Sequence, residues 1–106
     1  MEIKLFRGND HQVKFKFKNF TGTIDKMYFT VKCSSGKRRL QKKLDDGIAK
    51  ENEWYVITFV PKDTNDLECY LKMTYDIEIV VEGKTYTVVK DRFVLDEEVT
   101  RPEDEV

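Results

Sequence analysis

The chain has 106 residues, of which 40% are hydrophobic, 12% aromatic and 37% charged, with a net charge of −1. This length suits one domain, and the aromatic content argues against a chain that is disordered by composition. No apolar run approaches the ~18 residues of a membrane-spanning helix, and the first residues lack the apolar stretch of a signal peptide. We therefore expect a single globular domain without a membrane segment.

The charges are divided unevenly along the chain. Residues 1–50 carry 13 basic and 5 acidic side chains, whereas residues 51–106 carry 6 basic and 15 acidic ones. One interpretation is that a basic surface of one molecule meets an acidic surface of a neighbour. The other is that basic and acidic strands pair within one fold, and this is the simpler expectation.

Two cysteines, Cys33 and Cys69, are too few for a disulfide framework and have no metal-binding spacing. We expect both to be free thiols in a protein made in a reducing compartment. His11 is the only histidine, so a zinc site is not expected. The five glycines form no phosphate-binding loop, and no nucleophile–His–acid order is apparent. The sequence thus predicts neither a cofactor nor an enzyme.

Alternating apolar and polar residues predict a series of strands. Residues 12–18 alternate Val13, Phe15 and Phe17 with three lysines, as in a strand with one face in the core. Further strands are expected at 26–33, 37–44, 54–60, 75–81 and 84–95, with Leu40 and Leu44 pointing inward. Pro61 ends the fourth run, and a short helical turn is expected near 61–67. Glu82–Gly83 forms the centre of a two-residue hairpin.

This pattern predicts an all-β fold, an antiparallel β-sandwich or barrel of about seven strands. We expect the β-domain to span residues 1–96. Five of the ten residues 97–106 are acidic and one is proline, and we expect this segment to form a flexible acidic tail.

A basic cluster at 37–43 is the strongest electrostatic feature. Small barrels bind nucleic acid through such clusters when exposed aromatic side chains lie beside them. Here Phe15 and Phe17 should lie on the face opposite the lysines of their strand, and the pI of about 5.9 is low for a nucleic-acid binder. A solvated face or a contact with another protein is therefore the better interpretation.

Short motifs in the second half carry a family resemblance. They are DTNDL at 63–67, YDIE at 75–78 and Val99–Thr100 near the end, while RGND at 7–10 is similar to an RGD turn with one residue altered. In these motifs the chain resembles the immunoglobulin-like N-terminal module of phage upper-baseplate proteins, and small related domains of tailed-phage and prophage tail modules. The resemblance covers nearly the whole chain.

The resemblance implies an immunoglobulin-like fold and a non-enzymatic role in a phage tail or baseplate, as a virion component assembled in the host cytoplasm. The implied partners are other tail or baseplate proteins, or further copies of the chain. Alternatives are a saccharide- or ligand-recognition module, favoured if Tyr28, Tyr70 and Trp54 are exposed together, and a small nucleic-acid-binding barrel. The residues expected to contact a partner are Lys37, Arg38, Arg39, Lys42, Lys43, Glu97 and Glu98.

Overall fold

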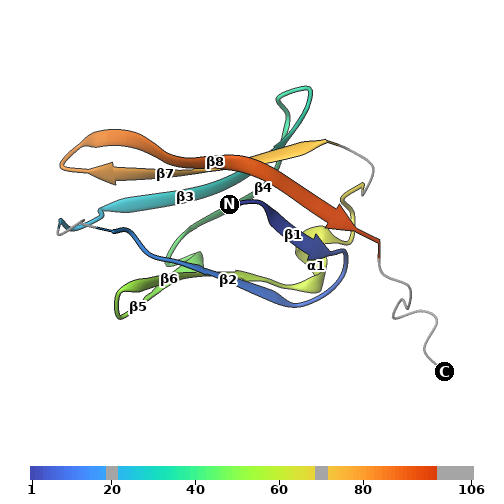
Figure 1. Ribbon diagram of the computed structural model, residues 1–106, viewed down its shortest axis with the longest axis horizontal. Coiled ribbons are helices and arrows are strands. Elements are labelled where there is room, and N and C mark those ends of the chain that lie inside the picture. The colour runs from blue at the N-terminus through green and yellow to red at the C-terminus, as the bar shows by residue number, and fades with distance from the viewer. Residues whose placement is uncertain (19–21, 69–71, 98–106) are drawn as a thin grey trace.

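The computed structural model describes residues 1–18, 22–68 and 72–97, and these residues form an all-β fold (Figure 1). No helix among them is long and apolar enough to cross a membrane. Cys69, Tyr70 and Glu98, together with the rest of the predicted tail beyond Glu97, lie outside the described residues. The described elements are β1 (Ile3–Phe6), β2 (His11–Phe15), β3 (Lys26–Cys33), β4 (Arg38–Leu44), β5 (Gly47–Glu51), β6 (Trp54–Phe59), α1 (Pro61–Thr64), β7 (Met73–Val81) and β8 (Lys84–Asp96).

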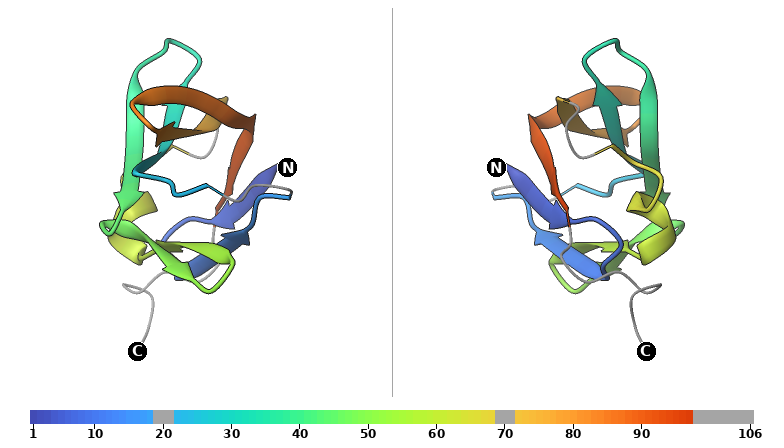
Figure 2. Two further views of the ribbon diagram at one scale, coloured as in Figure 1. Left: turned by 90° about the vertical axis from the view of Figure 1, so that its left-hand side faces the viewer. Right: turned by 90° about the vertical axis from the view of Figure 1, so that its right-hand side faces the viewer.

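The eight described strands form one mixed sheet in the order β1-β8-β7-β3-β4-β5-β6-β2. The sheet curls until its two end strands approach each other, which gives a nearly barrel-shaped molecule (Figure 2). No strand pairing joins β1 to β2 in the described part, but the amide of Phe6 donates a hydrogen bond of 3.2 Å to Nε2 of His11. β1 and β2 are therefore the two edge strands of the sheet, and the curl of the sheet brings these edges close to each other.

The expectation of a purely antiparallel arrangement is wrong. β1 runs parallel to the end of β8, and β4 runs parallel to β5 over two residue pairs, Lys43 with Gly47 and Leu44 with Ile48. The tight turn at Asp45 and Asp46 explains the second case, because Asp45 adopts a φ of 68° and Gly47 a φ of 101°. The chain turns there into a new strand direction rather than into a simple hairpin.

Strand positions largely follow the predicted alternation. β3 has the predicted bounds, and β2 ends at Phe15, earlier than residue 18. The helical turn forms over the first four residues of the predicted segment, and Glu82–Gly83 joins β7 to β8 with φ values of 51° and 76°. Six of the eight described strands match the segments predicted above, whereas the short strands β1 and β5 were not predicted.

Aromatic and aliphatic side chains fill the interior as the alternation predicts. Phe29, Phe59, Tyr75 and Phe93 are at most 2% exposed and contact one another, with ring centroids 5.4–6.3 Å apart. Lys14 of β2 and the two lysines just beyond it, Lys16 and Lys18, are exposed, while Phe15 is buried. Phe17 lies just beyond β2 and is partly buried against the core. The predicted register of the first strand is thus confirmed.

Candidate interaction surface

The hairpin between β3 and β4 projects from the body of the molecule and carries part of the predicted basic cluster (Figures 1 and 2). Its turn is closed by two backbone hydrogen bonds, from the amide of Gly36 to the carbonyl of Cys33 and from the amide of Cys33 to the carbonyl of Lys37. Gly36 adopts a φ of 83°, which favours glycine. Lys37 and Arg38 are exposed at this tip, and Lys43 is exposed at the far end of β4.

Lys42, one of the residues expected to contact a partner, does not belong to the exposed cluster, because its ammonium is paired inside the molecule. It pairs in register with Phe29 and lies on the core side of β4, between Leu40 and Leu44. Its Nζ donates a hydrogen bond of 2.7 Å to Oδ2 of Asp63, and the two side chains are 13% and 11% exposed. The alternation that predicted Leu40 and Leu44 inside also places residue 42 inside, and this signal was available in the sequence.

Asp63 also accepts a backbone hydrogen bond at the start of α1. The amide of Val60 donates a hydrogen bond of 2.8 Å to the same Oδ2 atom, at the start of α1. Lys42 Nζ also lies 6.0 Å from the centre of the Phe59 ring. The pair therefore ties β4 to the segment that follows β6, and it closes one end of the core.

Arg39 is only partly available for a partner. It stands at an irregularity of the β3–β4 pairing, since Leu40 lies opposite Val31 while Arg38 lies opposite Lys32. Its Nε atom is buried and has no hydrogen-bond partner among the described residues. The guanidinium of Arg38 donates to Oε1 of Gln41 at 3.2 Å. Within the hairpin, Lys37 and Arg38 thus remain the most accessible of the predicted contact residues.

The predicted acidic contact residues lie away from the hairpin. Glu97 is 62% exposed and approaches Arg7 at 3.7 Å, next to the end of β8. The hairpin tip and the end of β8 are well separated in the views of Figures 1 and 2. Within the described residues the structure therefore does not bring the basic and acidic parts of the predicted contact together.

A thiol lies at the base of the hairpin. Cys33 is buried, and its Sγ lies 2.9 Å from Oγ of Ser35. Hydrogen bonds from the side chain and backbone of Ser35 lower the pKa of the Cys33 thiol to about 7, with a smaller contribution from Arg39. These donors stabilise the thiolate against the opposing effect of burial. Cys33 is a free thiol, as expected.

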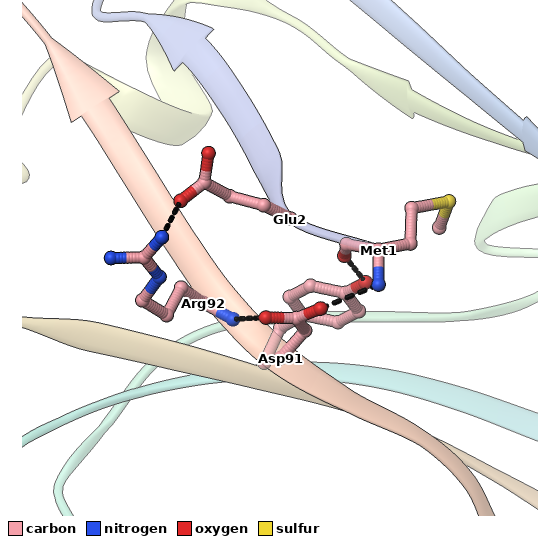
Figure 3. A network of polar contacts seen from close by, with 5 residues as sticks. Met1, Glu2, Asp91 and Arg92 are labelled. Atoms are coloured by element: carbon pink, nitrogen blue, oxygen red, sulfur yellow. Dashed lines mark hydrogen bonds and ion pairs between the residues drawn. The ribbon is translucent and has the colours of Figure 1, made fainter.

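A polar network holds the first residues against β8 (Figure 3). The amino group of Met1 forms an ion pair with Asp91, the hydroxyl of Tyr75 donates to the carbonyl of Met1, and Arg92 pairs with Glu2 at 2.8 Å. The amino group lowers the pKa of Asp91, whereas burial, assisted by the Asp91 charge, raises the pKa of Tyr75 to about 12. This network extends the β1–β8 contact by two residues.

The outer face of β2 and β6 combines an aromatic ring with lysines. Trp54 is 41% exposed, and Lys16 Nζ lies 5.0 Å from the centre of its ring. Sequence reasoning placed the aromatic side chains opposite the lysines, which holds for Phe15, but it missed that β6 places Trp54 beside Lys16. Tyr28 is half-buried on β3 next to Lys43, so it is not grouped with Trp54.

Comparison with known proteins adds no relative. The chain matches no protein-family model, and a search of curated proteins found no significant match.

Proposed function

We propose that the chain is a non-enzymatic structural module of a tailed phage or prophage, which acts in a tail or baseplate through protein–protein contacts. The motifs at 63–67 and 75–78 support this proposal. In the structure these motifs lie at buried positions: Thr64 at the end of α1 and Leu67 just after it are buried, and Tyr75 and Ile77 are at most 1% exposed in the core. A role in shaping the fold is what the resemblance implies for them.

The pairing order also supports an immunoglobulin-like sandwich as the finer description. The connection between β4 and β5 rests on only two residue pairs. Division of the sheet at this point gives one group of five strands, β1-β8-β7-β3-β4, and one of three, β5-β6-β2. Two such groups, packed over a shared core of alternating inward residues, are what a β-sandwich requires.

The observation that carries the proposal is the uncompensated charge of the β3–β4 hairpin. Some basic side chains pair with acids, as Lys4 does with Asp96 at 3.2 Å and Lys42 with Asp63. Lys37 and Arg38 form no ion pair with any residue in the described part of the chain, and they stand on a hairpin that projects from the body of the molecule (Figure 1). A projecting basic tip suits an acidic surface on a neighbouring subunit, and many copies in one assembly would multiply a weak contact.

The test is the composition of phage particles from the source strain. Particles are induced, banded in a density gradient and analysed by quantitative mass spectrometry. We expect the chain to co-migrate with intact particles in a fixed ratio to their tail proteins. A chain bearing Lys37→Glu and Arg38→Glu should be recovered at least tenfold less. The matched control, Lys14→Glu with Lys16→Glu, changes the charge equally on another face and should be incorporated normally. Absence of the wild-type chain from complete, infective particles would refute the proposal.

A second candidate function is recognition of a saccharide, which the exposure of Trp54 favours. An exposed indole ring is a stacking surface for a sugar ring, and Lys16 beside it adds a hydrogen-bond donor. Trp54 is the only tryptophan of the chain, so its fluorescence reports directly on this face. Titration with host cell-wall oligosaccharides should change the emission in a saturable way that Lys16→Ala weakens. An unchanged spectrum would exclude binding at this ring.

A further inference from the structure

β8 presents a long edge that the described chain leaves uncovered. β8 has 13 residues, and β1 pairs with only the last four of them, from Phe93 to Asp96. Met1 and Glu2 extend this cover to residues 91 and 92 through the contacts of Figure 3. On the same side of residues 84–90, the described part of the chain places no strand. Backbone donors and acceptors along such an edge are open to another strand.

The side chains of this edge favour a particular kind of strand. Tyr86 and Val88, two positions apart on β8, are 49% and 38% exposed and give this edge apolar surface. Lys84 and Lys90 stand at the two ends of the edge. Val88 has no opposite residue on β7, because Ile77 pairs with residue 89 and Glu78 with residue 87. The lysines and this bulge discourage pairing with a like edge, but they leave it open to an acidic strand.

We propose that this edge binds the acidic C-terminal segment of a second copy of the chain, added to the sheet as a strand beside residues 84–90. Residues 98–106 contain four acids and Arg101, and Val99 and Thr100 are β-branched residues suited to a strand. Pro102 follows, and it would end the added strand because it has no backbone N–H. The added strand is thus a short one that runs from Glu97 to Arg101.

The spacing of charges fits one alignment of the two segments. The proposed strand begins with Glu97 and the free edge begins with Lys84, while Glu103, just beyond the end of the strand, is as many residues from Glu97 as Lys90 is from Lys84. A parallel strand that starts with Glu97 beside Lys84 also places Val99 beside Tyr86 and Thr100 beside Thr87. It then continues the line of β1, which is parallel to β8 as well.

The donor must be a second molecule because of where the segment begins. β8 spans roughly 40 Å at ~3.3 Å per residue, and its C-terminal end lies at the opposite end from the free edge. β1 occupies the edge between them. A segment that starts after Glu97 would have to fold back over β1 to reach residues 84–90 of its own chain. Donation to a neighbour is head-to-tail, so it produces rings or open chains of molecules.

The test is sedimentation velocity of the full-length chain and two full-length variants. Lys84→Glu with Lys90→Glu damages the edge and keeps the C-terminal segment, while Val99→Pro damages the segment and keeps the edge. We expect the wild type to associate beyond dimers at low salt. Each variant alone should associate at least tenfold more weakly, and an equimolar mixture of the two should form heterodimers. Lys14→Glu with Lys16→Glu is the charge-matched control and should behave as wild type.

Three results would overturn this inference. They are a wild type that stays monomeric up to about 1 mM, variants that associate as strongly as the wild type, and a mixture that forms no heterodimers while the wild type associates. The inference concerns a different surface from the β3–β4 hairpin, and it can fail while the chain is still found in phage particles. It can equally hold for a chain that is absent from them.

Discussion

Removal of the Lys42 ammonium should strongly destabilise the fold. Lys42→Met keeps most of the apolar stem but leaves Asp63 only 11% exposed, and the Val60 amide still donates to its Oδ2 atom. Loss of one partner of a buried ion pair costs about 3–5 kcal/mol, and the slight exposure of this pair places the expected loss near ~3 kcal/mol. That is a large part of the ~5–15 kcal/mol that stabilises a domain of this size.

Urea denaturation followed by far-ultraviolet circular dichroism measures this loss. Lys43→Met is the matched control, because Lys43 is the next residue of β4 and is exposed, so it should change the free energy of unfolding by less than ~0.5 kcal/mol. In a double-mutant cycle with Asp63→Asn, the loss from both changes should be smaller than the sum of the single losses. Equal stability of the Lys42 and Lys43 variants would refute a stabilising Lys42–Asp63 ion pair, and Lys42 would then be treated as a surface lysine like Lys43.

Three further changes test the core, a turn and the thiol. Phe59→Ala should cost ~3–5 kcal/mol in the same assay, because Phe59 is fully buried, whereas Phe6→Ala, at a 47% exposed position, should cost far less. Glu82→Asn should raise the free energy of unfolding by about 0.5 kcal/mol, since asparagine tolerates the φ of 51° better; a lower melting temperature would contradict this. In a Cys69→Ser background, thiolate absorbance should show Cys33 titrating near pH 7. The pKa of an unfolded thiol is about 8.5, so the Cys33 thiolate should stabilise the fold fully above about pH 8.5 and progressively less as the pH falls to about 7. Titration of Cys33 above pH 8 would argue against the Ser35 hydrogen bonds.

The sequence predicted strand bounds and inward faces best where every second residue of a strand is buried in the core. In β3 the alternation of Met27, Phe29, Val31 and Cys33 gave the correct bounds and the correct inward face. β1 and β5 were not predicted because they are four and five residues long, which is too short for a clear alternation of apolar and polar residues. The parallel pairing of β1 with β8 joins residues about 90 positions apart, and nothing local in either segment predicts it.

The candidate surface was predictable only in part, for a physical reason that Lys42 illustrates. A lysine in a basic run looks like its neighbours in the sequence, but its position between Leu40 and Leu44 sends its stem into the core. Whether such a lysine is tolerated there depends on a carboxylate at the right distance. Asp63 supplies it from 21 residues further along the chain. The local sequence pattern predicts whether a side chain points toward the core, whereas the residue that pairs with it is determined by the tertiary fold.

The same distinction applies to the charge division between the two halves of the chain. Part of it is compensated within the molecule, since Lys4, Arg7 and Lys42 of the first half form ion pairs with Asp96, Glu97 and Asp63 of the second. The cations without such partners are therefore more informative about binding than the total charge of either half. Two such places are the hairpin tip at Lys37 and the β8 edge between Lys84 and Lys90. Because these surfaces belong to different strands, substitutions at one leave the other intact. The particle and sedimentation experiments can therefore assign each surface its own partner.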